Sequence, residues 1–556
     1  MQIRFPVCAC LLLAALFVVA PAGRAAAQGT APVPPADLAY RDVDRLAALG
    51  LLDAVLLGQR PYSRRELARM AGVARDRLGQ GAEPGDSTLA GATSAEARVI
   101  VDRLSARFAD DAPSRPFAGP RVFLLDGISL GATGTDAVRR GFSSTFSDKL
   151  AATIDPLATP RRLGPPAVQG QSIALELAQR VEATSWLAFH ARERLEYRRP
   201  SESGDDRTQG DLLLAGMRLR LGNVALDIGR EQLAWAATDA EGLFLAADAP
   251  ALDQISLTGD HPFVLPGSLR LLGPIRATLV LADLGPSAVR SHSTLLAYTV
   301  SVQPRPSVEL GATFMNHFGG EGGRASAFGD RLIDFVPFLD IFRSHNYTDT
   351  TRALDVESDK LLGVNGRLRL DRLAGLVLTT ELLIDDFDVH RIPTLFGWDG
   401  SQSFSATLPS IARTPLSLRL SATHMGVRTY THGQLSNGIT TRGRLLGDEL
   451  GPDAKAFGAG FTWNAAGVAR LGIEARTTLY SNSKYRVSDD GTHFVLHRVG
   501  EVTNELRDRL LSSLEMQRTD GIALVARAGA ERIRNADFGT RTRWSYVLDV
   551  ALRFAR

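Results

Sequence analysis

Cysteine and lysine are scarce in this chain of 556 residues. The only two cysteines are Cys8 and Cys10, and only four of the 63 basic residues are lysines. If the N-terminal segment is removed, the mature chain has no thiol, which excludes disulfides, a cysteine nucleophile and thiolate metal sites. The formal net charge is +2 with arginines and acids interspersed, and this balance predicts no nucleic-acid partner.

Long apolar runs are absent except near the N-terminus. There, Arg4 precedes an apolar run from about Val7 to Ala20, and small residues follow it up to Ala27. This order is typical of a secretory signal peptide, so we predict that residues 1–27 direct export and are removed. A retained membrane helix is the alternative, but the run is shorter than the ~20 residues that span a bilayer. Beyond it no apolar run is long enough for a helix to cross a membrane, so any crossing would need strands.

A small helical region is predicted before the strands. Residues 28–36 are rich in proline and alanine, and we interpret them as a flexible lead. Apolar residues then recur at helical spacing, and two segments, Ser63–Glu66 and Thr93–Glu96, have the form of a capping box. We predict a helical bundle over residues 37–118, with helices at about 37–49, 64–78 and 94–109.

From about residue 121 to the end, the period of hydrophobicity changes to two. Apolar residues fall on one face of each segment and charged residues on the other. In residues 211–221, for example, the apolar residues Leu213, Ala215 and Met217 share one face, and Arg218 and Arg220 lie on the other. In the last segment Leu548, Val550 and Leu552 oppose Asp549 and Arg553. Tight turns alternate with long irregular loops throughout this region. The pattern predicts a long series of antiparallel strands, each with one apolar and one polar face.

We interpret residues 119–556 as a transmembrane antiparallel β-barrel, because a closed barrel leaves no unpaired sheet edge in a bilayer. At roughly 24 residues for each strand and its connection, this region holds about 18 strands. The predicted fold class is therefore mainly β, with a small N-terminal helical bundle. An exported β-helix or a multi-domain sandwich would give the same alternation and is the alternative. The low aromatic content, 7%, departs from the aromatic girdles usual in membrane barrels.

Motifs for catalysis and metal binding are weak. Gly127–Gly131 has the form of a nucleophile elbow around Ser129, but that motif needs a strand–turn–helix context, and here it lies among alternating strand residues. Asp385, Asp386 and Asp388 could hold a hard cation, but the ligand set is incomplete, and the histidines lack metal-site spacing. We therefore predict no catalytic residue, no metal site and no cofactor. A hydrolase built on Ser129 is the least favoured hypothesis.

One segment is too polar for a core strand and too apolar for a linker. GREQLAWAATDAEGLFL, residues 229–245, follows a predicted strand and holds one of only five tryptophans. An indole ring offers an apolar platform to a sugar, and arginine and carboxylate groups make directed hydrogen bonds. The alternative is an inward-folded loop that narrows the barrel lumen through packing alone.

This segment and three later ones resemble the Wzi capsule-assembly family. GREQLAWAATDAEGLFLAADAP resembles a strand-exit segment of that family, and FMNHFGGEGGRASAFGD resembles its GGEG loop. ELLIDDFD resembles its strand of paired acids, and TYTHGQLSNGITTRGRLLGDELGPDA resembles its late tyrosine/histidine–glycine segment. The resemblance implies an outer-membrane barrel of about 18 strands with a helical bundle attached. It also implies that the protein binds capsular or exopolysaccharide at the cell surface without catalysis.

The resemblance also supplies candidate polysaccharide-binding residues from these four segments. They are Arg230, Gln232, Trp235, Asp239, Asp248, Glu321, Arg324, Asp385, Asp386, Tyr430 and His432. The implied partners are the polysaccharide, outer-membrane lipid and the polysaccharide export machinery.

The charged face of the strands supports a second hypothesis, an outer-membrane porin or transport channel. Residues 40–70 resemble a surface-layer-homology repeat, with Ser63-Arg64-Arg65-Glu66 in place of its Thr-Arg-Ala-Glu. Such repeats hold cell-wall polymers, so the channel would be tethered to the cell wall. The sequence leaves open which polysaccharide is bound and whether the lumen is open or plugged.

Overall fold

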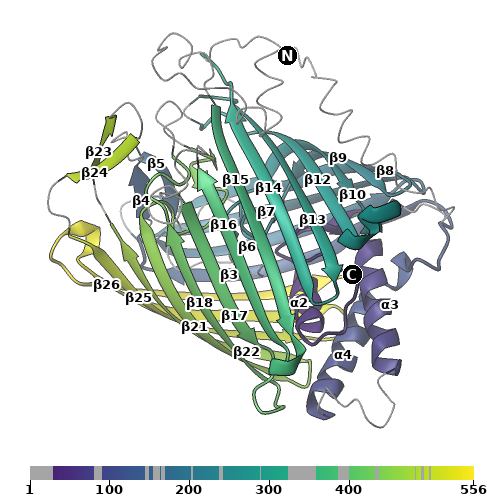
Figure 1. Ribbon diagram of the computed structural model, residues 1–556. Helices are drawn as coiled ribbons and strands as arrows, with labels where there is room; N and C mark the ends of the chain where they lie inside the picture. Colours follow the sequence, from purple (N-terminus) through teal and green to yellow (C-terminus); the bar gives the residue numbers. More distant parts are fainter. Residues whose placement is uncertain are drawn as a thin grey trace.

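The protein, seen here in a computed structural model, is a closed antiparallel β-barrel with a group of helices at one end (Figure 1). The structure describes residues 29–80, 91–138, 140–143, 150–154, 163, 169–201, 205–236, 242–288, 290–322, 358–385, 400–431, 438–481, 484–489, 494–499 and 503–556. The predicted signal peptide lies outside these residues. Within them, no helix is both long and apolar enough to cross a membrane.

The helices lie at the three predicted places. They are α2 (Ala39–Ala48), α3 (Arg64–Gln80) and α4 (Gly91–Arg107), and α4 is followed by a 3-10 turn, η1 (Ala109–Asp111). Their apolar faces share one buried core, which includes Tyr40, Val43, Leu46, Leu67, Met70, Ile100, Leu104 and Phe108. Ser63 caps α3 as predicted, because its Oγ accepts the Glu66 N–H at 3.2 Å. A short strand pair, β1 (Pro32–Val33) with β2 (Tyr62–Ser63), ties the lead segment to the start of α3.

The prediction that Thr93 and Glu96 form a capping box is wrong. Helix α4 begins at Gly91, so Thr93 lies inside it and is buried. Both oxygens of the Glu96 carboxylate instead accept hydrogen bonds from Arg45 of α2, at 2.6 and 2.7 Å. A charge-assisted pair of this kind is about twice as strong as a neutral hydrogen bond, so Glu96 joins two helices rather than capping one.

Eighteen strands close the barrel, as predicted, and the last strand pairs with the first. In chain order they are β3 (Arg121–Thr135), β6 (Gly170–Glu182), β7 (Leu187–Pro200), β8 (Arg207–Leu221), β9 (Val224–Glu231), β10 (Leu252–Gly259), β12 (Pro274–Asp283), β13 (Thr294–Arg305), β14 (Val308–Phe318), β15 (Ser358–Leu370), β16 (Leu376–Asp385), β17 (Gly400–Leu408), β18 (Leu416–Met425), β21 (Ala454–Ala465), β22 (Ala469–Tyr480), β25 (Glu505–Gln517), β26 (Ile522–Arg534) and β27 (Arg543–Ala555). A two-residue strand, β11 (Phe263–Val264), extends the wall beside β12.

Besides β1 and β2, three strand pairs of the described residues lie outside the wall. They are β4 (Arg140–Ser143) with β5 (Leu150–Ile154), β19 (Thr440–Thr441) with β20 (Arg444–Leu445), and β23 (Lys484–Asp489) with β24 (Phe494–Val499).

The wall has two faces that meet different surroundings. In β27, Tyr546, Leu548 and Leu552 are exposed on the outside, while Ser545 and Asp549 are buried on the inside. Exposed apolar side chains in a continuous band are stable only against lipid, so the wall is that of a membrane-spanning barrel.

One predicted face is wrong at Leu213, which we expected outside with Ala215 and Met217. The β7–β8 register shifts at Arg192 and Glu193, and this turns Leu213 inward. There it packs against Leu163, Leu214 and Ala251.

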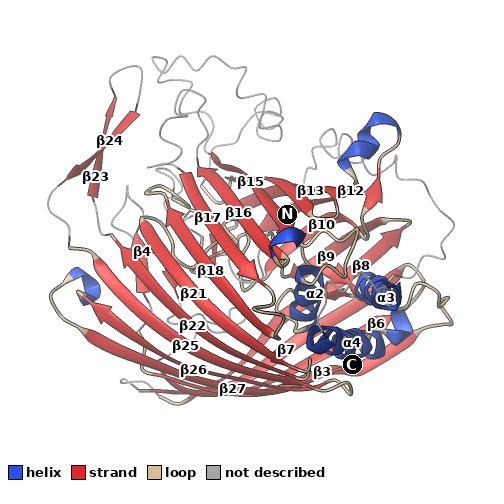
Figure 2. Ribbon diagram, turned by 60° about the horizontal axis from the view of Figure 1, so that its bottom comes forward, coloured by secondary structure: helices blue, strands red, loops and turns tan. Residues whose placement is uncertain are grey.

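The two ends of the barrel differ. Connections are short at one end, such as the two-residue turns after β8 and β13, and long at the other. In outer-membrane barrels the short turns face the periplasm. The helices and the C-terminus lie at this inner end, whereas the β23–β24 hairpin projects from the opposite, outer end (Figures 1 and 2).

Candidate functional site

Described residues of two outer loops fold back into the outer part of the barrel. The first runs from the end of β9 to the start of β10, and the second runs from the end of β18 to the start of β21. Their apolar residues form one core with the inward side chains of the wall. This core, which we call the outer plug, includes Trp235, Leu243, Phe244, Leu245, Tyr430, Leu445, Leu446 and Leu450 from the loops and Met315, Leu361, Leu383 and Tyr480 from the wall.

Trp235 is at the centre of the outer plug and is 1% exposed. Its backbone N–H donates to the Leu245 carbonyl at 2.9 Å, which folds the segment back on itself. The segment therefore has the inward-folded position of the second interpretation, and the indole of Trp235 is not exposed to solvent. Leu243, Phe244 and Leu245 draw the segment inward, because together these side chains bury more apolar surface than a solvent-exposed loop could.

Tyr430 links the two outer loops. Its hydroxyl donates to the Leu243 carbonyl of the first loop and accepts the Asp448 N–H at 3.0 Å. Its backbone N–H donates to Asp385 Oδ2 at 2.8 Å. Burial holds the pKa of Tyr430 well above its ordinary value, so the hydroxyl stays protonated and able to donate. Gly447 packs so closely against this hydroxyl that a Cβ there would collide with it.

Acidic side chains of β16 fasten both loops to the wall. Asp385 holds the second loop at Tyr430, and Glu381 Oε2 accepts the Leu243 N–H of the first loop at 2.8 Å. Both carboxylates are buried. The sequence singled out Asp385 but missed Glu381, although Glu381 lies on the same inward face four residues earlier. That spacing of two acids on one strand face was the available signal.

The remaining described candidates lie around the outer plug. Gln232 is buried, and its side-chain amide donates to the Ala247 and Ala249 carbonyls at 2.9 and 3.1 Å, which shapes the first loop. Asp248 is half-buried in the same loop, and Glu321 is exposed after β14.

Arg230 forms an ion pair with an acid of the neighbouring strand. It lies on the outer face of β9 and forms two hydrogen bonds with Asp253 of β10, at 2.7 and 2.8 Å. Arg442, at the tip of the β19–β20 hairpin, is exposed and near enough to this pair to interact with it electrostatically. The sequence did not single out Arg442.

The structure thus divides the candidate residues into two groups. Gln232, Trp235, Asp385 and Tyr430 lie together in the outer plug, whereas Arg230 and Glu321 lie at the rim. Four further candidates, Asp239, Arg324, Asp386 and His432, lie outside the described residues. In the part of the chain that is described, no group of three or more potential ligands for a metal ion was found.

A loop of the helical region enters the barrel from the inner end. We call it the finger, residues 56–61, and it lies against the inward faces of β12 and β14. Arg276 donates to the Gln59 carbonyl at 2.6 Å, and the Glu309 carboxylate accepts the Leu57 and Gly58 N–H groups at 3.0 and 2.8 Å. These contacts fix the helical region at the inner end of the barrel (Figure 2).

The finger and the outer plug meet inside the lumen. The Arg60 N–H donates to the Ala234 carbonyl at 2.8 Å, and the Ala234 N–H donates to the Arg60 carbonyl at 3.0 Å. Ala234 precedes the central tryptophan of the outer plug. Protein therefore extends continuously from the helical region to the outer loops along this side of the lumen.

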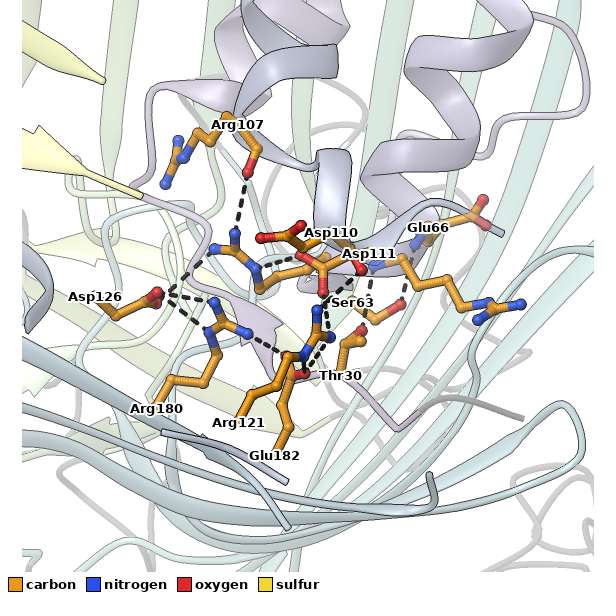
Figure 3. Close-up of polar contacts among 12 residues, drawn as sticks. Thr30, Ser63, Glu66, Arg107, Asp110, Asp111, Arg121, Asp126, Arg180 and Glu182 are labelled. Carbon is orange, nitrogen blue, oxygen red and sulfur yellow. Dashed lines mark hydrogen bonds and ion pairs between the residues drawn. The ribbon is translucent and has the colours of Figure 1, made fainter. Parts of the chain in front are cut away.

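Ion pairs join the helical region to the first wall strands (Figure 3). Arg64, at the start of α3, donates to Asp111 at 2.8 Å and lies 3.8 Å from Asp126 of β3. Arg180 of β6 donates to the same Asp126 at 3.0 Å and also pairs with Glu182. Each carboxylate in this seam therefore already contacts at least one arginine.

Ser129 lies within strand β3 and not at a turn into a helix. The strand–turn–helix geometry of a nucleophile elbow is therefore not present at Ser129, and the structure gives the hydrolase hypothesis no support there.

Comparisons with known proteins agree with this architecture. The family model of the capsule assembly protein Wzi matches residues 151–543. Among solved structures, Wzi of Escherichia coli superimposes with a TM-score of 0.62. That protein is described as an outer membrane protein involved in group 1 capsule assembly and as a carbohydrate-binding β-barrel. The two chains are 13% identical, and the match covers 94% of this chain and 98% of that one.

Weaker matches include OprD of Pseudomonas aeruginosa, with a TM-score of 0.41, 11% identity and coverage of 78% of this chain and 94% of that one. OccD3 of the same organism has a TM-score of 0.38, 14% identity and coverage of 79% and 92%. A comparison with curated protein sequences found no match. The family model spans well over half of the chain, and the barrel has a lipid-facing wall. The chain is therefore an outer-membrane β-barrel that belongs to the capsule assembly protein Wzi family.

Proposed function

We propose that this chain binds capsular or exopolysaccharide at the cell surface and helps to assemble or retain it there, without catalysing a reaction. The family match over residues 151–543 carries the proposal, and the E. coli Wzi structure is described as a carbohydrate-binding barrel. The partners of the present chain would then be the polysaccharide, outer-membrane lipid around the wall and the export machinery that delivers the polymer.

The outer plug supports this function because it makes the outer surface rigid. A polymer loses conformational freedom when it binds, so a surface that is already ordered adds less to that entropic cost. The buried residues Trp235, Gln232, Asp385 and Tyr430 would position the outer loops and not touch the polymer. The rim residues Glu321 and Arg442, which are exposed, and Arg230 and Asp248, which are half-buried, would contact it. The arginines would donate charge-assisted hydrogen bonds to its carboxylate and hydroxyl oxygens, and the acids would accept them from its hydroxyl groups.

Protein inside the lumen favours this function over a diffusion channel. The outer plug lies in the outer part of the lumen and the finger in the inner part, and the two are joined through Arg60 and Ala234. A channel would need an aqueous path past both elements.

The proposal can be tested in a capsule-producing host that lacks its own copy of the gene. We expect the chain to raise the fraction of polymer that stays on washed cells, relative to polymer in the medium. Arg442→Ala combined with Glu321→Ala should reduce retention several-fold, and should weaken binding of the isolated polymer to the purified chain. Arg270→Ala is the matched control, because this arginine is exposed at the opposite, inner end. Equal retention with and without the chain would contradict the proposal.

A further inference from the structure

A cavity of about 160 Å³ lies between the helical region and one side of the barrel wall. It is bounded by the lead segment and the start of α2 on one side and by β27, β3, β6 and β7 on the other, and it reaches the inner turn at Arg518. Its wall is lined by small inward residues, among them Gly131, Ala174, Ala178 and Ala551. The absence of larger side chains at these positions leaves the space open.

The cavity is rich in arginine. Eight arginines and five carboxylates line it. Most of the carboxylates are already engaged. Asp37 accepts two hydrogen bonds from Arg107, at 2.6 and 2.8 Å, and Asp42 accepts two from Arg103, at 2.7 and 2.9 Å.

On the wall, Glu176 of β6 is held by Arg194 of β7, at 2.6 and 3.0 Å. Asp126 is held in the seam with Arg180 and Arg64 (Figure 3). The fifth carboxylate, Asp549 of β27, accepts a hydrogen bond from the Thr133 hydroxyl of β3.

Two arginines remain in excess. Arg192 of β7 and Arg553 of β27 both line the cavity, and within the described part of the chain neither has a hydrogen bond or a close ion pair. Both interact electrostatically with Glu176, which Arg194 already holds, and with Asp37, which Arg107 holds, and Arg553 is also repelled by Arg192 and Arg41. Two cations whose neighbouring carboxylates are already engaged would be stabilised by an added anion in this partly enclosed space.

We propose that this cavity binds an oxyanion, a carboxylate or a phosphate, carried on a ring of about monosaccharide size. The planar guanidinium groups of Arg192 and Arg553 match the paired oxygens of either group. Benzene, a six-membered ring without substituents, fits a cavity of ~150 Å³ in another protein, so this cavity has room for the charged group and part of a pyranose ring, and the remaining hydroxyls would lie toward the inner side. The lining includes Arg518, which is exposed in the inner turn after β25, so entry would be from that side. This site is separate from the outer rim and does not depend on polysaccharide binding there.

The test uses the full mature chain in a non-ionic detergent at low ionic strength. Calorimetric titration compares glucuronate, glucose 6-phosphate, inorganic phosphate and glucose. We expect both charged sugars to bind, glucose not to bind, and binding to weaken as salt is added. Arg192→Gln combined with Arg553→Gln should lower the affinity for the charged sugars at least tenfold. Arg532→Gln, which changes an exposed arginine on β26, is the control and should bind as the native chain does.

A second variant separates the ring from its charge. Ala551→Leu fills the cavity but keeps both arginines, so it should weaken binding of the charged sugars more than binding of inorganic phosphate. The heat-dependent shift of the barrel in electrophoresis reports whether each variant is folded. Unchanged affinity in the folded double variant, equal binding of glucose, or binding of inorganic phosphate alone would overturn the proposal. Loss of polymer retention through rim variants would leave these titrations unchanged, so the two proposals fail independently.

Discussion

Removing the hydroxyl of Tyr430 should loosen the outer plug without unfolding the barrel. In Tyr430→Phe the ring still fills its space, but the Leu243 carbonyl and the Asp448 N–H both lose their partner. Both residues are buried, and leaving a buried polar group without a hydrogen bond costs ~1–3 kcal/mol. Allowing for partial relaxation, the outer loops should lose about 2–4 kcal/mol of local stability.

Hydrogen–deuterium exchange measured by mass spectrometry can resolve this local effect. Since 1.4 kcal/mol corresponds to a factor of ten, peptides from both outer loops should exchange about 30 to 700 times faster in the variant. Peptides from β26 and β27 should be unchanged, because the wall hydrogen bonds do not involve Tyr430. Unchanged exchange in the loops would refute the role of Tyr430 as their link.

Tyr298→Phe provides the matched control. Tyr298 lies on the outer face of β13 beside Phe314, with 5.2 Å between the ring centres. Among the described residues its hydroxyl has no hydrogen bond. The same atom is removed, but no buried group loses a partner, so the change should stay within ~0.5 kcal/mol.

Three further predictions follow from the wall, the filled lumen and the helical region. Leu279→Arg places a charge on the lipid face of β12 and should lower the free energy of unfolding, measured by refolding into lipid, by ~2–4 kcal/mol. Its control is Leu271→Arg in the exposed inner turn η2 (Gly267–Leu272), which should lower that free energy by ~0–1 kcal/mol. Equal losses would contradict the membrane depth assigned to Leu279. In planar bilayers the native chain should give no steady conductance. A variant that lacks residues 29–115, and in which a short glycine–serine linker replaces residues 234–250, should conduct ions. Steady conductance by the native chain would show that the lumen is not blocked. Burial raises the pKa of Asp37, but the charge and hydrogen bonds of Arg107 outweigh it, so the folded-state pKa is lowered. The stability that the Asp37–Arg107 pair contributes should be complete above the ordinary carboxyl pKa of ~3.9 and should decline as the pH falls below it. Thermal unfolding of the helices, followed by circular dichroism, should show that Asp37→Asn removes this part of the pH dependence. Identical pH profiles for the native chain and the variant would contradict the prediction.

The barrel could be predicted from the sequence because its signal is local. A strand that faces lipid on one side and protein on the other must alternate, and Leu548, Asp549 and Val550 show this within three residues. The strand number followed from the length of the region and the usual length of a membrane strand. Leu213 was misplaced because a register shift reverses the two faces, and nothing in the adjacent sequence marks the shift.

The direction in which the outer loops fold could not be predicted in the same way. Trp235 and Tyr430 are residue types that suit both a sugar-binding surface and a buried core. What decides their burial is the fit to partners far along the chain, such as Met315 and Leu383 of the wall. The apolar residues Leu243–Leu245 were the best local signal for an inward fold, because a loop in water gains nothing from three consecutive large apolar side chains.

The charged inner face could not distinguish an open channel from a filled barrel, because both need it. In a channel the charges face water. Here Glu449 of the second outer loop lies between Arg476 and Arg509 of the wall, at 3.4 and 3.3 Å, and Arg509 also contacts Glu531 at 3.3 Å. A charged wall can therefore hold an inserted loop as well as a column of water, provided that the loop brings the complementary charge. Whether such a barrel is filled depends on acids like Glu449 in the long loops, and the pairing of those acids becomes visible only when the loops are seen inside the lumen.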